Sequence, residues 1–232
     1  MPHENNVLEG YSDLEKGAYL CTIASLATAD RHASDDELDY IEALCDAANL
    51  SEQQKQGVLN SATDLSGADL DKCLEVLKTS ELKYSLITDL MAVGDADKDY
   101  STEEKENVQR IADYLQINQQ QFSLLNEFTN KTAAAKVSPT EIKQTDFLSS
   151  LGLKDKFKNA GIDQNNLLKG LLSIAGPIIL AKMVSGGLGR NGNNNRRNNG
   201  LGGLGSIISM INGGRGMQGA GGLLSGIFRK GF

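Results

Sequence analysis

The chain has 232 residues, which is enough for one core of moderate size with an appendage or for two small domains. Its net charge of −7 conceals a split: residues 1–130 hold 26 acids against 9 bases, or −17, and residues 131–232 hold 4 acids against 14 bases, or +10. Binding to a phosphate backbone depends on Lys and Arg, so we expect that this acidic body does not bind nucleic acid.

The cysteines and the N-terminus indicate the compartment. Cys21, Cys45 and Cys73 each fall on an apolar helical stripe and form no Cys-x-x-Cys motif, so we expect small buried side chains in a reducing environment. The first residues lack the basic and apolar regions of a signal peptide. We therefore predict a cytoplasmic protein, with a route to the inner face of the membrane through the tail described below.

Seven helices are predicted between residues 12 and 135. Capping boxes, in which Ser and an acid three residues later exchange hydrogen bonds with the backbone, mark helix starts at Ser12, Ser34 and Ser101. Ser51 and Ser80 begin two more. The predicted helices cover 12 to about 29, 34 to about 49, 51 through 62, a stretch marked by 70–77, 80–94, 102–116 and about 119–135. No stretch alternates with period two, so we predict an all-α bundle of helical hairpins.

The composition changes after residue 135. We predict a domain over 12–135 that folds alone from about 12 to 130, a linker with weak helices over 136–163, and a basic, Gly-rich apolar tail over 164–232. Only twelve uncharged residues separate Lys169 from Lys182, short of the ~20 that a simple membrane span needs. From 186 to 232, 16 of 47 residues are glycine, and we expect part of this tail to be disordered.

The tail joins apolar segments to sparse Lys and Arg, without acids after Asp163. This pattern is typical of segments that lie at a membrane surface or associate with copies of themselves. We therefore predict membrane binding or self-association through residues 165–232. The open alternative is that the tail docks on the acidic face of its own body.

A helix–acidic turn–helix unit occurs twice. When 67 is subtracted from each number, Ala96–Glu104 falls on Ala29–Glu37, and the apolar positions on both sides follow without a gap. Ile87, Leu90 and Met91, for example, answer to Leu20, Ile23 and Ala24. The sequence therefore predicts an internal duplication.

The second acidic turn carries six acids in the twelve positions from Asp95 to Glu106. Its oxygen donors have the spacing of a calcium-binding EF-hand loop, with a backbone carbonyl at the seventh position. The candidate ligands are Asp95, Asp97, Asp99, Ser101, Glu103 and Glu106. Tyr100 replaces the glycine that makes the sharp turn in such loops, which argues against the standard loop conformation.

Two further interpretations stay open at these turns. If Ser101 caps a helix, Glu103 and Glu104 are first-turn acids that the helix dipole favours without a metal. The first turn offers a weaker set at the same positions. Its candidate ligands are Asp30, His32, Asp36 and Asp39, with Thr28 and Ser34 at the two remaining loop positions.

Both turns resemble the TerB-like family of tellurite-resistance proteins, whose signature is Ala-Asp-Gly-acid-apolar-Ser-x-acid-Glu between two helices. The matching residues are Ala96–Glu104 and Ala29–Glu37, and the resemblance covers about residues 12–130. Lys98 and Arg31 replace the motif glycine. The resemblance implies a duplicated helical fold, an acidic surface suspected of metal binding, and a role in tellurite and other stress responses near the membrane. It implies no established catalytic activity.

The residues themselves favour a non-enzymatic function. The chain has two histidines and shows neither a nucleophile–histidine arrangement nor a phosphate-binding loop before a helix. We predict a stress-response module that binds a divalent cation, Ca²⁺ or another, and is tethered by its tail to membrane or partners. The alternative is a metal-free scaffold whose acidic face binds a basic protein partner.

Overall fold

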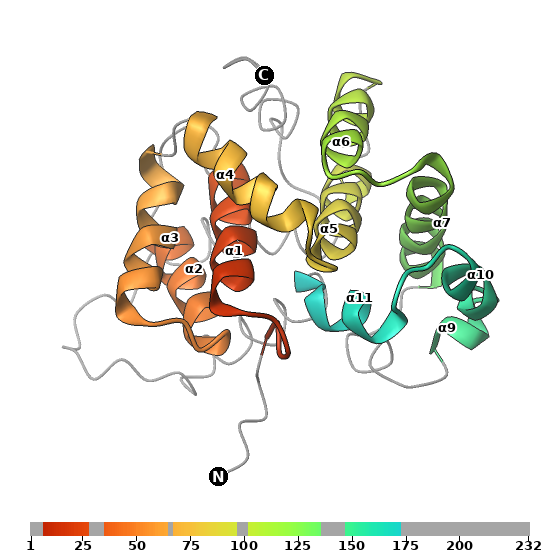
Figure 1. The fold of residues 1–232 in the computed structure, drawn as a ribbon, viewed down its shortest axis with the longest axis horizontal. Coiled ribbons are helices and arrows are strands. Elements are labelled where there is room, and N and C mark those ends of the chain that lie inside the picture. Colours follow the sequence, from red (N-terminus) through yellow and green to blue (C-terminus); the bar gives the residue numbers. More distant parts are fainter. Residues whose placement is uncertain (1–6, 28–34, 65–66, 97–101, 136–146, 173–232) are drawn as a thin grey trace, which may run out of the picture.

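The computed structural model describes residues 7–27, 35–64, 67–96, 102–135 and 147–172, and these residues contain helices and turns but no strand (Figure 1). The prediction of an all-α protein is confirmed. The helices are α1 (Asp13–Ala27), α2 (Asp35–Ala47), α3 (Glu52–Asp64), α4 (Gly67–Lys78), α5 (Leu82–Ala96), α6 (Thr102–Tyr114), α7 (Gln119–Ala135), α9 (Phe147–Ser150), α10 (Lys154–Asn159) and α11 (Gln164–Gly170).

The duplication appears as two packed groups of helices, which we call the first copy (α1–α4) and the second copy (α5–α7). In the first copy α1 packs against α3 and α4, and α2 packs against α3. In the second copy α5 packs against α6 and α7. The two copies meet where α5 contacts α1 and α4.

Local sequence fixes the same helix ends in both copies. Asn49 and Gln116, which are 67 residues apart, both have positive φ values, of 56° and 59°. The next residue in each copy closes a Schellman turn, because Leu50 N donates to the Cys45 carbonyl at 3.1 Å and Ile117 N to the Ala112 carbonyl at 2.9 Å. The duplication therefore extends to individual backbone hydrogen bonds.

Capping boxes begin the helices that follow these turns. Ser51 Oγ accepts from Gln54 N at 3.4 Å while Gln54 Oε1 accepts from Ser51 N at 3.0 Å. Asn118 and Gln121 exchange the equivalent bonds at the start of α7. The capping box predicted at Ser12 is confirmed, since Ser12 N donates to Glu15 Oε2 at 2.8 Å.

Residues 147–172, which the sequence assigns to a linker and to the start of the tail, are part of the core. Phe128 of α7 makes edge-to-face contacts with Phe147 and Phe157, with ring centroids 6.5 and 5.8 Å apart. The buried apolar side chains of this segment are Phe147, Leu148, Leu153, Phe157, Ile162, Leu167, Leu171 and Leu172. Its helices have only four to seven residues, too few for a helical period to stand out in the sequence.

The helix α11 lies very close to α5. A Cβ atom added to Gly170 would lie 2.2 Å from Ser85 Oγ and 2.8 Å from a methyl carbon of Leu82, so a larger residue there would have to displace these side chains. Ser85 Oγ donates to the Leu167 carbonyl at 3.0 Å, and Tyr11 Oη donates to the Asn166 carbonyl at 3.0 Å. This contact places the start of the predicted tail against the second copy.

Other polar contacts hold α9 and α10 to α7. Lys131 Nζ donates to the Leu151 carbonyl at 2.7 Å, and Lys156 Nζ lies 2.7 Å from Glu127 Oε2. Within the described ranges no helix is both long enough and apolar enough to cross a membrane.

Candidate functional site

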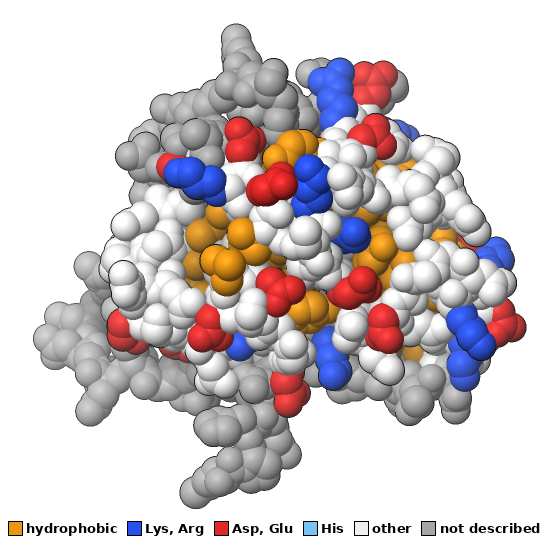
Figure 2. Space-filling model, in the orientation of Figure 1, with side chains coloured by type: hydrophobic (Ala, Val, Ile, Leu, Met, Phe, Trp, Pro, Cys, Tyr) orange, Lys and Arg blue, Asp and Glu red, His pale blue; other side chains and the backbone are white. Residues whose placement is uncertain are grey.

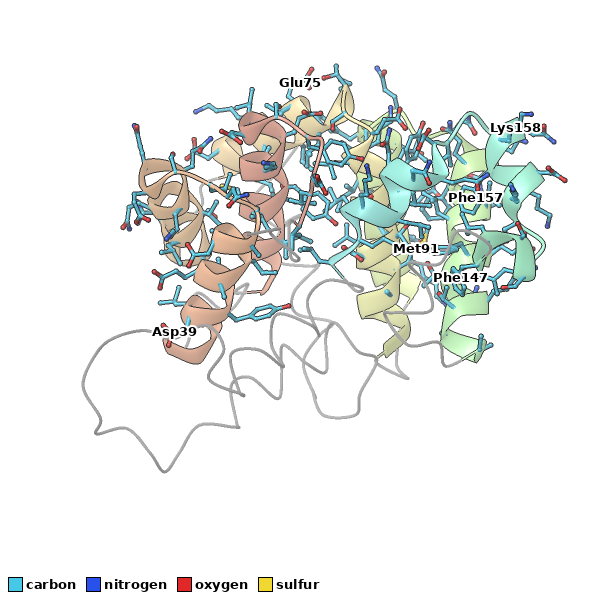
Figure 3. The ribbon with its side chains drawn as sticks, turned by 90° about the horizontal axis from the view of Figure 1, so that it is seen from below. Asp39, Glu75, Met91, Phe147, Phe157 and Lys158 are labelled. Atoms are coloured by element: carbon cyan, nitrogen blue, oxygen red, sulfur yellow. The ribbon has the colours of Figure 1, made fainter. Side chains whose placement is uncertain are left out.

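The helix ends that flank the two acidic turns lie on one side of the molecule. In Figure 3 α2 begins beside Asp39 on the lower side, and α5, drawn in yellow beside Met91, runs to its end on the same side. The helices α1 and α5 are equivalent by the duplication, as are α2 and α6. The fold thus brings the flanks of both turns to a common face.

At the second turn, α5 ends at Ala96 and α6 begins at Thr102. Asp95 therefore lies in the last turn of α5, Glu103 in the first turn of α6, and Glu106 one turn further, with an exposed side chain. The other candidate ligands, Asp97, Asp99 and Ser101, lie outside the described residues, as do the side chains of Asp95 and Glu103.

At the first turn the structure places two of the four candidate ligands. Asp36 lies in the first turn of α2, with its side chain outside the described part, and Asp39 follows one turn later with an exposed side chain. Asp30 and His32 lie outside the described residues.

Among the side chains that the structure describes, no three His, Cys, Asp or Glu residues group closely enough to hold a metal ion. Figure 2 shows acidic and basic side chains interspersed on the face it presents. Several acids of the described residues pair with a lysine on the same helix, as Asp69 does with Lys72 at 2.9 Å. Such exposed pairs contribute little to stability.

A buried carboxylate that the sequence reasoning missed joins three parts of the chain. Asp89 on α5 accepts from Tyr19 Oη of α1 at 2.6 Å and from the backbone N of Leu172 at 2.8 Å, both at Oδ2. It is only 5% exposed. Burial, and after it the charge of Asp89, raise the pKa of Tyr19 well above 10. The sequence signal that could have predicted this buried carboxylate is an acid inside the mostly apolar run from Leu86 to Met91.

Tyr40 of α2 lies near the same carboxylate, but within the described part of the chain its hydroxyl has no hydrogen-bond partner. Its side chain is 2% exposed. Burial, followed by the charge of Asp89, raises the pKa of Tyr40. The charge of Asp89, on the second copy, therefore acts on tyrosines of two helices of the first copy, α1 and α2.

The three cysteines differ in how deeply they are buried. Cys45 is fully buried, which fits the expectation, but Cys21 and Cys73, on the packed helices α1 and α4, are only half-buried. All three thiols are free.

Comparison with known proteins finds a family match that extends over both copies. Residues 16–127 match the model of the family described as tellurite resistance protein TerB. That range begins in α1 and ends in α7, so it includes both copies and excludes residues 147–172. Searches among curated proteins and among solved structures give no match. The resemblance is confirmed in that residues 16–127 match the TerB family of tellurite-resistance proteins.

Proposed function

We propose that this protein is a non-enzymatic stress-response module that binds a divalent cation, with Ca²⁺ as the best candidate, at its second acidic turn. The observation that supports this proposal is the helix geometry. The helices α5 and α6 pack together and leave only residues 97–101 between them. Asp95 and Glu106 therefore stand on contacting helices that flank Asp97 and Asp99. Calcium suits such a turn because it accepts six to eight oxygen ligands in variable geometry.

A metal-free scaffold is the second candidate, and one observation favours it. α6 begins at Thr102, the eighth position of the calcium-type loop, so Glu103 and Glu104 fall in its first turn. The positive end of the helix dipole stabilises acids at these positions without a cation. In that case the acidic turns would present their carboxylates to a basic protein partner.

Calorimetric titration of CaCl₂ into the full-length protein separates the two candidates. We expect binding heat from the wild-type protein and none from the double variant Asp97→Ala/Glu106→Ala, with unchanged helical circular dichroism. The matched control Glu9→Ala/Asp155→Ala removes two exposed acids elsewhere and should bind as the wild type does. Magnesium should bind more weakly, because it requires a tight octahedron and keeps its waters.

Two results would contradict the site. Binding that survives in Asp97→Ala/Glu106→Ala would move the cation to other residues, and the first turn could then be tested through Asp36 and Asp39. An absence of heat in the wild type, together with capture of a polybasic peptide that is lost in the same variant, would establish the scaffold instead.

We propose further that the residues after Leu172 bring the module to a membrane surface, or to a second copy of itself. Supporting this, the structure fixes the chain at Leu172 through Asp89, so the basic remainder starts from a defined point on the acidic body. Liposome flotation of the full chain and of one ending after Gly176 tests the proposal. Flotation should need the tail and anionic lipid and should weaken with salt. Oligomers that dissolve on truncation, without flotation, would assign the tail to self-association.

A further inference from the structure

The protein body ends α11 by bonding an amide that a longer helix would use. In a continuous helix the Leu172 N–H would donate to the Leu168 carbonyl. Here it donates to Asp89 of α5 at 2.8 Å, and Leu171 before it has extended backbone angles, with φ −72° and ψ 115°. The helix therefore stops at Gly170, and the chain that follows is fixed to α5.

The sequence of this segment is that of an amphipathic helix. Its start is capped by Asp163, which accepts from Asn166 N at 2.8 Å. At the period of an α-helix, four leucines fall on one side and Lys169 falls on the other. Ile174 and Ala175 continue the apolar spacing in the sequence. We call the four side chains the leucine face: Leu167, Leu168, Leu171 and Leu172.

The leucine face is covered by the protein's own body, where α11 packs on α5 (Figure 1). Leu167, Leu171 and Leu172 are at most 2% exposed, and Leu168 is partly buried. These leucines also begin the apolar run that the sequence offers for membrane binding. The start of that run is therefore held by the body.

We propose that the leucine face is an interaction surface for an anionic lipid membrane, and that docking on α5 keeps it closed. This inference rests on the membrane binding proposed for the tail, and it adds that body and membrane compete for the same four side chains. In the bound state lipid replaces α5 as the partner of the leucines, and the Leu172 amide becomes free to continue the helix.

The chemistry of the segment indicates this partner. A helix with a leucine-rich side and a basic polar side is typical of segments that lie in a membrane interface. Lys169 supplies the basic side, and no acidic residue follows Asp163. Anionic headgroups attract basic residues near the surface, so an anionic membrane is the surface that this end of the chain fits best.

The closed state depends on a close approach at Gly170. A Cβ atom added there would lie 2.2 Å from Ser85 Oγ. Ser85 also donates to the Leu167 carbonyl, and Tyr11, just before α1, donates to the Asn166 carbonyl, both at 3.0 Å. Because glycine also weakens a helix, Gly170→Ala should both loosen the docking and favour the continued helix. Tyr11→Phe removes one of the closing bonds from outside the segment itself.

Flotation of the full-length protein measures the closing effect, with vesicles of equal parts phosphatidylglycerol and phosphatidylcholine. Tyr11→Phe should raise the vesicle partition coefficient about five-fold, because a lost hydrogen bond shifts the protein toward the open state. Gly170→Ala should raise it about ten-fold or more. Val58→Ala is the control, because it removes buried apolar atoms from α3 and should leave the coefficient unchanged.

A tryptophan reports where the leucine face goes, because the chain has none of its own. Leu168→Trp places an indole on that face, and brominated acyl chains should quench its fluorescence when the segment leaves α5 and enters the lipid. Gln53→Trp, at an exposed position of α3, is the matched control and should stay unquenched. The flotation variants decide the question without this probe if Leu168→Trp loses its helical circular dichroism.

The outcomes separate this inference from the proposed function. If the full chain floats, but the Leu168→Trp indole is unquenched or both loosening variants bind as the wild type does, the closed leucine face is wrong and the tail's membrane binding stands. If neither the wild type nor any variant floats, both are wrong. Oligomers of Gly170→Ala without flotation would give the leucine face a second copy as its partner and overturn the lipid surface.

Discussion

The two copies share their helix ends but differ in what covers their first helices. In the first copy α1 is packed by α3 and α4, which follow it closely in sequence. In the second copy α5 packs against α6 and α7 and also against α11, which comes from beyond the duplication. A repeated pattern thus determines each hairpin, while the element that completes the core can come from elsewhere in the chain.

One pair of equivalent residues, Thr22 and Asp89, illustrates this difference between the copies. Thr22 in α1 donates to the Ala18 carbonyl of its own helix at 2.8 Å, which satisfies its hydroxyl locally. Asp89, 67 residues later, instead holds Tyr19 of the first copy and the backbone of Leu172. A buried carboxylate must find donors, so this residue links the copies to each other and to the C-terminal segment.

The largest effect should come from removing the segment that covers α5. A chain ending after Lys136 loses the eight buried apolar side chains of residues 147–172, which contribute on the order of 10 kcal/mol or more before chain entropy is subtracted. A domain has only ~5–15 kcal/mol of net stability. We therefore expect the shortened chain to melt without cooperativity and to bind a hydrophobic dye, contrary to the expectation from the sequence that 12–130 fold alone.

The control for this truncation is a chain ending after Ser185, which keeps every described residue and should melt as the full chain does. Cooperative melting of the chain ending after Lys136, measured by circular dichroism and calorimetry, would show instead that the two copies form a self-sufficient core.

A smaller effect should follow from cutting the link between the copies. Tyr19→Phe removes the hydrogen bond to Asp89, and a bond to a charged group is worth ~1.5–3 kcal/mol. Tyr40→Phe is the matched control, because it removes a buried hydroxyl with no partner among the described residues and should be neutral or stabilising. Urea unfolding measures the change in unfolding free energy that each variant causes. Equal losses would mean that the bond to Asp89 adds nothing.

The same two tyrosines predict an alkaline limit. Folding raises the pKa of Tyr19 and Tyr40, so their contribution is complete below the unfolded tyrosine pKa of ~10 and is lost as the pH rises above it. Each Phe variant should therefore reduce the fall in unfolding free energy between neutral and strongly alkaline pH. If the unfolding free energy of both variants falls with pH as steeply as that of the wild type, other groups cause the alkaline loss of stability.

The smallest effects are expected from replacing two glycines, one at the contact between α11 and α5 and one in the first copy. Gly170→Ala places a methyl group against Ser85 and Leu82 and should cost ~1–3 kcal/mol through overpacking between α11 and α5. Gly57→Ala, in the middle of α3, meets no atom within 4 Å and should stabilise its helix by ~0.5–1 kcal/mol. Opposite signs in thermal melting would confirm the close approach of α11. Two stabilised variants would show that α11 moves away easily.

The sequence by itself determined the features that depend on neighbouring residues. The helix starts at Ser12 and Ser51, the all-α class and the 67-residue repeat all follow from capping chemistry and apolar spacing within one stretch of chain. The resemblance of the acidic turns to the TerB family could also be recognised from sequence, because the motif lies within one continuous stretch of chain. The cation remains a prediction, because most of its candidate ligands lie outside the described residues.

Only the tertiary structure decided which distant residues meet. The docking of residues 147–172 joins short helices to the body, and the buried bonds of Asp89 with Tyr19 and Leu172 each join positions more than 50 residues apart. Such contacts depend on how helices pack, and many partners of similar hydrophobicity would satisfy the same local pattern. Burial then gives the few polar groups a definite partner, because an unpaired one inside the core is costly.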